Sequence, residues 1–213
     1  MQAGIDEAGR GPVLGPMVMA GVICTSEQVT KLKALGVTDS KLLSEIKREE
    51  LFEQVKEIVT DYHVVSLSPK DIDAKETRNI SLNDLEAEAT ITILKKINAK
   101  KAVVDCPSTN PPAYKAQLQK ELVGVELICE HKADLNYTEA AAASILAKVT
   151  RDREIEALKK EIGIDFGSGY PSDPKTKTFV TEHWNKYPEL FRKTWKTYQN
   201  AVSKSSQKGL SDF

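Results

Sequence analysis

The sequence predicts an α/β fold with a five-stranded mixed sheet, helices on both sides of the sheet and a C-terminal helical extension. Short apolar runs typical of buried strands recur along the first two thirds of the chain. The first strands follow one another closely, whereas the later ones alternate with helical patterns, which indicates a meander followed by crossover units. With 213 residues, of which 40% are hydrophobic, the chain is long enough to bury a sizeable core.

The N-terminal segment predicts a strand with apolar residues at alternate positions before two adjacent carboxylates, Asp6 and Glu7. A second strand is predicted at Met17–Cys24, a nearly continuous apolar run. The Gly-Pro dipeptides between them indicate a hairpin-like antiparallel pair. Neighbouring side chains of a regular strand face opposite sides of a sheet. We therefore expect the first strand to end or twist at Glu7, so that both carboxylates can face one site.

The middle of the chain predicts a helix, a strand, an irregular segment and a second helix. The first helix is capped by Ser44 and carries apolar residues on one face, and a third strand follows at Tyr62–Leu67. The polar stretch Asp71–Asn79 is expected to be irregular. Ser81, with an acidic residue three positions later, resembles a capping box and predicts a helix to about Ile97.

Two further strands are predicted at Ala102–Asp105 and Val125–Cys129, separated by a helix at Ala113–Leu122. Right-handed crossovers would make both strands parallel to the first strand. A long helix is then expected at Thr138–Ile162, with Lys148, Arg151 and Arg153 left more exposed than its apolar face.

The C-terminal part predicts two more helices and a tail. Ser172 is expected to cap the first of these helices, and the second is expected at Phe191–Val202. We expect a catalytic domain at 1–165, a helical extension packed on it at 166–202 and a flexible tail at 203–213.

Four carboxylates are predicted to meet at one edge of the sheet. Because the carboxyl ends of parallel strands lie together, this edge is where open α/β sheets bind ligands. Such a cluster repels itself unless cations are bound, and ligation by oxygen alone suits Mg²⁺ or Mn²⁺. Two ions about 3.5–4 Å apart suit hydrolysis of a phosphodiester. The predicted catalytic and metal-binding residues are Asp6, Glu7, Asp105 and Asp134.

Net charge, cysteine content and the length of apolar runs limit the kinds of partner and compartment that the protein can have. The net charge of −1 gives no overall positive field, so nucleic acid would have to bind through a local basic patch. The three cysteines are odd in number and lack metal-type spacing, which is typical of a reducing compartment. No apolar run reaches membrane-spanning length. We expect a soluble, cytoplasmic monomer that makes no contact with a membrane.

Five motifs in order resemble those of type 2 ribonuclease H, also called ribonuclease HII, in its archaeal form. They cover most of the chain, which makes a chance match improbable. The motifs are Gly4-Ile5-Asp6-Glu7-Ala8-Gly9-Arg10-Gly11-Pro12, Asp39-Ser40-Lys41, His131-Lys132-Ala133-Asp134, the segment 143–152 and Gly167-Ser168-Gly169-Tyr170-Pro171-Ser172-Asp173.

The resemblance implies a ribonuclease H-like sheet and an endonuclease that cuts the RNA strand of RNA–DNA hybrids and single ribonucleotides embedded in duplex DNA. It implies cleavage on the 5′ side of the ribonucleotide, leaving a 3′-hydroxyl and a 5′-phosphate, with roles in ribonucleotide excision repair and RNA primer removal. The four acidic ligands of the family fall on the four carboxylates that the sheet argument selects.

The resemblance also implies residues that bind the substrate. The Gly9-Arg10-Gly11 backbone would contact the 2′-hydroxyl, and Tyr170 would hydrogen-bond that group and stack on the next sugar. The 2′-hydroxyl is the group that distinguishes RNA from DNA. Lys148 and Arg151 share a helix face and, with Lys41, are predicted to hold phosphate.

Two other functions remain open from the sequence. The first is a nuclease of the same architecture without discrimination of the 2′-hydroxyl, which an all-DNA substrate would reveal. The second is a catalytically silent binding protein on this fold, which metal-dependent cleavage would exclude.

The end of the chain resembles the peptide by which replication and repair enzymes dock on a sliding clamp. Gln207, Leu210 and Phe213 are spaced so that a short helical turn would present an aliphatic and an aromatic side chain to a groove. We therefore expect a sliding clamp as a partner, with an unstructured polar tail as the alternative.

Overall fold

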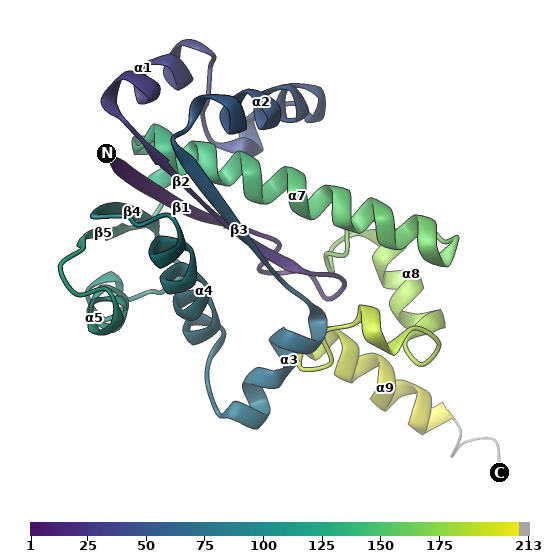
Figure 1. Ribbon diagram of the computed structural model, residues 1–213. Helices are drawn as coiled ribbons and strands as arrows, with labels where there is room; N and C mark the ends of the chain where they lie inside the picture. The colour runs from purple at the N-terminus through teal and green to yellow at the C-terminus, as the bar shows by residue number, and fades with distance from the viewer. Residues whose placement is uncertain (209–213) are drawn as a thin grey trace. The chain divides into compact units, whose positions relative to one another are not determined.

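The computed structural model describes residues 1–208, which contain one five-stranded sheet in the order β3-β2-β1-β4-β5 (Figure 1). β1 runs antiparallel to β2, while β1 and β4, and β4 and β5, run parallel. The predicted mixed sheet is confirmed, as is the direction of the fourth and fifth strands. The strands are β1 (Gln2–Ala8), β2 (Met17–Cys24), β3 (Asp61–Leu67), β4 (Lys101–Asp105) and β5 (Glu126–Glu130).

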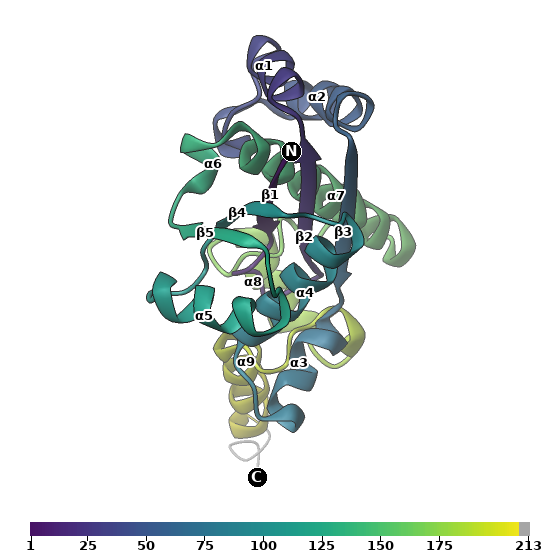
Figure 2. The same ribbon diagram turned by 60° about the vertical axis from the view of Figure 1, so that its left-hand side comes forward.

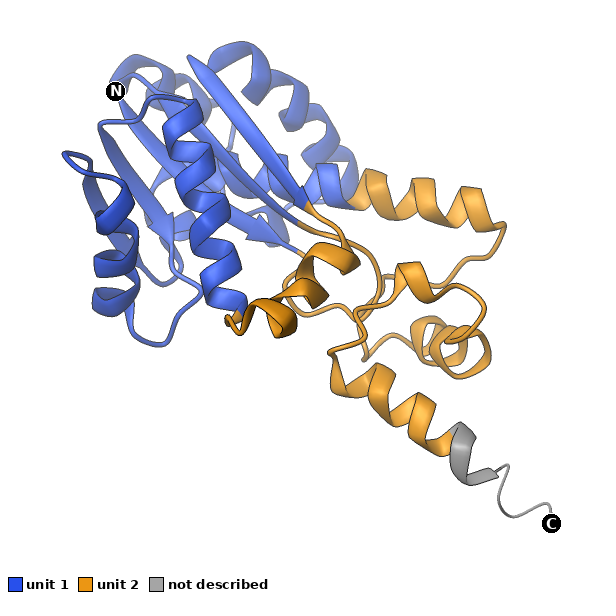
Figure 3. Cartoon of the chain, turned by 60° about the horizontal axis from the view of Figure 1, so that its bottom comes forward, with its two compact units in different colours: residues 1–8, 18–66, 82–151 blue, residues 9–17, 67–81, 152–213 orange. Residues whose placement is uncertain are grey.

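The chain divides into two compact units, each assembled from three separate segments (Figure 3). Unit 1 contains residues 1–8, 18–66 and 82–151, and unit 2 contains residues 9–17, 67–81 and 152–213. The boundary between them interrupts both the first hairpin and the long helix. The expected domain at 1–165, with its extension and tail, stays a prediction, because compactness does not test which segments fold alone.

Helices cover both faces of the sheet in unit 1, as predicted (Figure 2). On one face, β2 packs with three helices around a buried apolar cluster. On the other face, a Cβ added to Gly21 would lie 2.4 Å from Ile93 Cγ2, so α4 approaches β2 closely there. The helices of this unit are α1 (Ser26–Ala34), η1 (Ser40–Leu42), α2 (Glu45–Ile58), α4 (Leu82–Lys96), α5 (Pro111–Glu121), α6 (Ala133–Asn136) and the first part of α7 (Thr138–Ile162).

β1 and α7 approach each other more closely than side chains would allow. A Cβ on Gly4 would lie 2.2 Å from the carbonyl carbon of Glu139 and 2.3 Å from the nitrogen of Ala140. The first turns of α7 are rich in alanine, and Ala140 to Ala143 are almost completely buried. Small residues on both elements therefore allow β1 to lie directly against α7 at Gly4, two residues before Asp6.

Unit 2 has an aromatic core. The Phe179 ring centroid lies 5.4 Å from that of Phe166 and 5.8 Å from that of Phe191. Phe191 also forms an isolated antiparallel bridge with Leu14. The helices of this unit are α3 (Pro69–Arg78), the end of α7, α8 (Pro174–His183), η2 (Pro188–Leu190) and α9 (Lys196–Lys208).

The prediction of an irregular segment after β3 is wrong, because α3 occupies it. The Ser68 side chain accepts from the Asp71 N–H and the Asp71 side chain accepts from the Ser68 N–H, which makes a capping box. Pro69 occupies the first turn, where its missing N–H costs nothing. Ile72 is the only residue of α3 that is buried, so the apolar periodicity was too weak to indicate a helix.

Two boundaries near the C-terminus also differ from the predictions. The N-cap of α8 is Asp173 instead of Ser172, because the Asp173 side chain accepts from the Lys175 N–H. α9 begins at Lys196, since Phe191 is taken up by the bridge, and the helix continues beyond Val202 to Lys208. None of the helices in the described part of the chain combines the length and the apolar character that a membrane span requires.

Candidate active site

Asp6 and Asp105 lie side by side because their strands are parallel and in register. Ile5 of β1 pairs with Val104 of β4, so the residues that follow them stand at the same level and on the same face. Asp105 is the last residue of β4. Among the described residues, one carboxylate oxygen from each of Asp6, Glu7 and Asp105 lies within 4.8 Å of the others. The predicted meeting of these three carboxylates is thus present at the carboxyl ends of the strands.

The strand does not end at Glu7, so that half of the prediction is wrong, while the alternative of a twist at Glu7 stays a prediction. The ladder with β2 continues through Glu7, paired with Met19, to Ala8, paired with Val18. Glu7 nevertheless reaches the cluster. The Asp6 carboxylate turns along the strand and accepts the Glu7 N–H at 2.7 Å, and the Glu7 side chain is one methylene longer than that of aspartate. The carboxylate oxygens of Glu7, Asp6 and Asp105 therefore lie together although the ladder is unbroken.

Asp134 is placed near these three carboxylates by a hydrogen bond from the backbone of α6. Lys132, with φ of 58°, reverses the chain after β5, and the Ala133 N–H donates to Asp105 Oδ1 at 3.0 Å. Asp134 follows directly and is 5% exposed. The charges of Asp105 and Asp134 both act on their neighbours in the cluster, which places all four predicted carboxylates in one electrostatic group.

Burial and mutual repulsion raise the pKa of two carboxyl groups in this cluster. Burial, followed by the charges of Glu7 and Asp105, raises the pKa of Asp6 well above its usual value. Burial, followed by the charges of Asp39 and Asp105, raises the pKa of Asp134 to about 6. Hard divalent cations remove such repulsion, and carboxylate oxygens are the ligands that they prefer. The donor set therefore fits a divalent metal centre.

The Asp39-Ser40-Lys41 loop adds two charges that act on the cluster. Partial burial alone would lower the pKa of Lys41, but the carboxylates of Asp39, Asp6 and Asp134 raise it overall. The loop is fixed to α7 by a 2.6 Å hydrogen bond between the hydroxyls of Ser40 and Ser144. Asp39 was not predicted as a site residue. Its place beside Lys41 in the motif was the available signal.

The two basic residues predicted on α7 differ in exposure. Lys148 is half-buried, whereas Arg151 is only 2% exposed. The expectation that Arg151 is exposed is therefore wrong, because this turn of α7 is covered by neighbouring elements. Phosphate binding by Lys148 and Arg151 stays a prediction.

The residues predicted to recognise the sugar lie together in unit 2. Gly9 has φ of 82°, a left-handed conformation that glycine adopts without strain. A Cβ on Gly11 would lie 3.5 Å from Tyr170 Cε1, so the tyrosine ring flanks the turn. The Val13 N–H donates to the Gly169 carbonyl at 2.9 Å, which attaches the two loops. Tyr170 thus lies beside Gly11 at the end of the Gly9-Arg10-Gly11 turn.

Arg192 contacts this turn and was not predicted from the sequence. Its guanidinium donates to the carbonyl oxygens of Gly9 and Arg10, which precede it by more than 180 residues. No local motif marks the residue, so only the folded chain reveals the contact.

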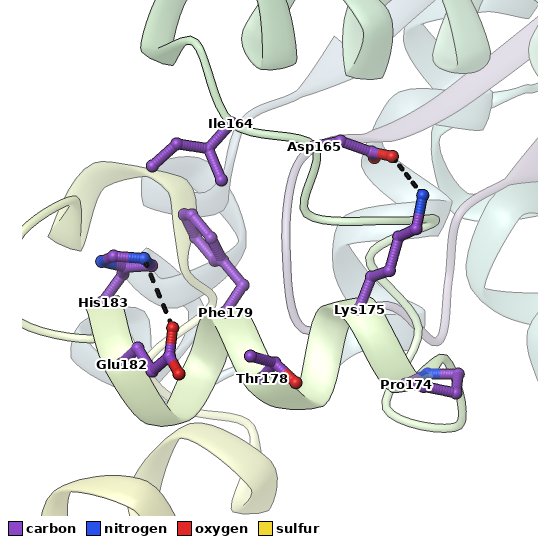
Figure 4. A pocket seen from close by; sticks show the side chains of 8 residues that line it. All are labelled: Ile164, Asp165, Pro174, Lys175, Thr178, Phe179, Glu182 and His183. Carbon is purple, nitrogen blue, oxygen red and sulfur yellow. Dashed lines mark hydrogen bonds and ion pairs between the residues drawn. The ribbon is translucent and has the colours of Figure 1, made fainter.

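One pocket of unit 2 is lined by none of the predicted site residues. It has a volume of about 420 Å³ and contains the Lys175–Asp165 ion pair at 2.5 Å (Figure 4). It is lined by Ile164, Asp165, Pro174, Lys175, Thr178, Phe179, Glu182 and His183. Of the predicted clamp-binding residues, Leu210 and Phe213 fall outside the described residues, and Gln207 belongs to the last turn of α9.

The fold and the carboxylate cluster define a hydrolase of the ribonuclease H class, and comparisons agree. The model of the family described as ribonuclease HII matches residues 3–198. The chain therefore belongs to the ribonuclease HII family. A ribonuclease HII of Thermococcus sibiricus is 45% identical over 207 residues, covering 94% of this chain and 91% of the relative.

Two solved structures show the same fold. The ribonuclease H2 of Pyrococcus horikoshii superposes with a TM-score of 0.87 at 42% identity, covering 95% of this chain and 97% of that one. The ribonuclease HII of Archaeoglobus fulgidus, solved in a complex with PCNA, gives a TM-score of 0.84 at 42% identity, with coverages of 92% and 95%.

Proposed function

We propose that this ribonuclease H hydrolyses the RNA strand of RNA–DNA hybrids and also cuts single ribonucleotides embedded in duplex DNA. Cleavage occurs on the 5′ side of the ribonucleotide and leaves a 3′-hydroxyl and a 5′-phosphate, an activity suited to ribonucleotide excision repair and RNA primer removal. The observation that carries the proposal is that Asp6, Glu7 and Asp105 offer oxygens within 4.8 Å of one another, with Asp134 following Ala133, whose N–H donates to Asp105.

Asp6, Glu7, Asp105 and Asp134 would hold two divalent ions, Mg²⁺ or Mn²⁺. When bound, such ions activate water and stabilise the leaving oxygen of a phosphodiester. The carboxylates themselves keep the cluster negative and oriented, with Asp105 fixed by the Ala133 N–H. Lys41 and Lys148 supply positive charge for the phosphates of the scissile strand.

Discrimination of RNA from DNA would belong to the turn of unit 2. Main-chain groups of Gly9, Arg10 and Gly11 would contact the 2′-hydroxyl, and Tyr170 would hydrogen-bond the same group while its ring packs on the next sugar. The exposure of Tyr170, at 38%, supports a role in contacting substrate. In the sequence, the turn follows the metal-binding Glu7 after a single residue, Ala8.

The test is cleavage of an end-labelled duplex that contains one ribonucleotide, compared with an all-DNA duplex of the same sequence. We expect a single product cut 5′ to the ribonucleotide, with no cleavage after Asp134→Asn. Asp61→Asn, at an exposed position of β3, is the matched control and should keep full activity. Equal cleavage of both duplexes would favour a nuclease without discrimination of the 2′-hydroxyl.

We further propose that the C-terminal segment binds a sliding clamp through Gln207, Leu210 and Phe213. The relative from Archaeoglobus fulgidus that was solved with PCNA supports a partner of this kind. Replacing residues 207–213 with a scrambled sequence should abolish binding to the clamp in surface plasmon resonance. Hydrolysis of a short hybrid without the clamp should be unchanged. Retained binding by the scrambled variant would overturn the proposal.

A further inference from the structure

Arg192 is fully buried and uses three nitrogens to hold the turn that contains Gly9-Arg10-Gly11. Its Nη2 donates to the Gly9 carbonyl at 2.7 Å, its Nη1 to the Arg10 carbonyl at 3.0 Å and its Nε to the Gly15 carbonyl at 3.0 Å. A buried guanidinium is costly unless its donors are satisfied, and here main-chain oxygens satisfy them. Lysine carries a single ammonium and could not reach three separated carbonyls in this fixed arrangement.

Trp195 holds the carbonyl of the next residue of the turn, Gly11. Its Nε1–H donates to the Gly11 carbonyl at 3.3 Å, so Arg192 and Trp195 together hold the carbonyls of three consecutive residues. The indole ring lies against two cations, with the Arg192 guanidinium carbon 5.1 Å and the Lys75 ammonium 5.2 Å from its centroid. Contacts of this kind favour one orientation of the ring.

The segment that contains Arg192 and Trp195 is itself fixed to α3. Asp73 Oδ2 accepts the Lys193 N–H at 2.8 Å, and Asp73 Oδ1 accepts the Thr194 N–H at 3.1 Å and its hydroxyl at 2.9 Å. Lys75 donates to the Thr194 hydroxyl at 2.6 Å. The donors that hold the turn are thus anchored by a helix and do not belong to a loose loop.

The direction of the carbonyls determines the direction of the amides. In a planar trans peptide the N–H points opposite to the C=O. Because the Gly9 and Arg10 carbonyls point at Arg192, the N–H groups of Arg10 and Gly11 point to the opposite side. Consecutive amides directed to one side form a concave site for an oxygen atom of a ligand. The next residue is Pro12, which has no N–H.

We propose that Arg192, assisted by Trp195, is a positioning residue for selection of the ribonucleotide, because it aims the amides of Arg10 and Gly11 at the 2′-hydroxyl. This inference rests on the proposed function. Arg192 does not touch the substrate. It acts through the carbonyls behind the turn, so its loss leaves the carboxylate cluster intact and weakens discrimination.

The experiment measures binding by a chain that cannot cleave. Asp134→Asn is the parent, and Arg192→Lys, Trp195→Phe or Lys159→Met is added to it. Fluorescence anisotropy gives the ratio of affinities for a duplex with one ribonucleotide and for the all-DNA duplex. Lys159→Met is the matched control, because Lys159 also lies over an aromatic ring of unit 2, 5.8 Å from the Phe166 centroid, without contacting the turn. A variant that is merely less stable loses binding-competent protein for both duplexes, which leaves the ratio unchanged.

We expect Arg192→Lys to reduce the ratio by at least about fivefold, the equivalent of one hydrogen bond, and Trp195→Phe to reduce it less. Lys159→Met should keep the ratio of the parent. Amide hydrogen exchange of residues 9–15 should become faster in Arg192→Lys and stay unchanged in the control.

Three outcomes decide between the claims. A parent that binds both duplexes equally overturns the proposed function, and the inference with it. A parent that discriminates, together with Arg192→Lys and Trp195→Phe variants that discriminate equally well, overturns the inference alone. If Arg192→Lys does not fold, the milder Trp195→Phe variant decides, since it removes one donor and keeps an aromatic ring between the two cations.

Discussion

Asp134 combines burial with two acidic neighbours, and its pKa of about 6 lies above the usual value of 3.8. Between these two values the folded chain keeps a proton that the unfolded chain has lost. The contribution of this group to the free energy of unfolding therefore falls as pH rises from about 4 to about 6, and stays low at higher pH.

Asp134→Asn should remove this dependence, because asparagine does not ionise. In the presence of a chelator at about pH 7.5, we expect the variant to be more stable than the parent by about 1–3 kcal/mol. At about pH 4 the difference should nearly vanish. Urea unfolding of the variant and the parent at both pH values measures the difference in the free energy of unfolding. A difference that does not change with pH would show that Asp134 has its usual pKa in the folded chain.

Tyr170 provides a second prediction at this scale. Tyr170→Phe removes the hydroxyl and keeps the ring beside Gly11, so packing of the turn should be preserved. The loss of one hydrogen bond to the 2′-hydroxyl should lower the cleavage rate of a single-ribonucleotide duplex by about 5–30-fold. Single-turnover rates measure this, with Tyr62→Phe on the exposed part of β3 as the control. An unchanged rate would exclude the hydroxyl from recognition.

At the scale of elements, the approach of β1 to α7 is limited by Gly4. Gly4→Ala would force a Cβ to within 2.2 Å of the main chain of α7, and a main chain cannot move aside as a flexible side chain can. We expect a cost of about 3 kcal/mol or more in the free energy of unfolding, the upper end of the range for overpacking. Urea unfolding is the measurement.

Gly36→Ala is the control for this substitution. Gly36 has φ of 84° and no atom within 4 Å of an added Cβ, so only the strain of a left-handed alanine remains, about 1–2 kcal/mol. If both substitutions cost the same, the contact between β1 and α7 is able to relax.

Elements with strong patterns were predictable. Met17–Cys24 and Thr138–Ile162 have both boundaries as predicted, because a continuous apolar run and a long apolar period each leave little choice. α1 and α3 were not predicted, because each buries a single apolar residue, Leu32 and Ile72 respectively. Their capping boxes were the signals present in the sequence.

For the whole molecule, the net charge of −1 leaves only local basic residues to contact phosphates, and the number of these contacts sets how strongly salt weakens binding of nucleic acid. If Lys41, Lys148 and Arg151 make the phosphate contacts, the logarithm of the association constant should fall against the logarithm of salt concentration with a slope of about −3. Anisotropy titrations of the Asp134→Asn variant from low to high salt measure it. A slope steeper than about −6 would indicate a larger basic surface than these residues provide.

The meeting of Asp6 and Asp105, which lie far apart in the sequence, was predictable because it depends only on the order and direction of their strands. The additional role of Asp39 required knowledge of where its loop packs. The contacts of Arg192 could not be predicted, because every residue has a backbone carbonyl and the sequence does not mark which ones a side chain will contact. The carbonyls that Arg192 contacts belong to residues 177 to 183 positions away.

That separation has a consequence during synthesis. The turn at residues 9–11 leaves the ribosome long before Arg192 and Trp195, whereas the last carboxylate of the cluster, Asp134, emerges well ahead of them. A nascent chain therefore contains all four carboxylates before it contains the guanidinium that supports the turn. If Arg192 positions the turn as proposed, premature termination after Asp134 would remove this support and spare all four carboxylates.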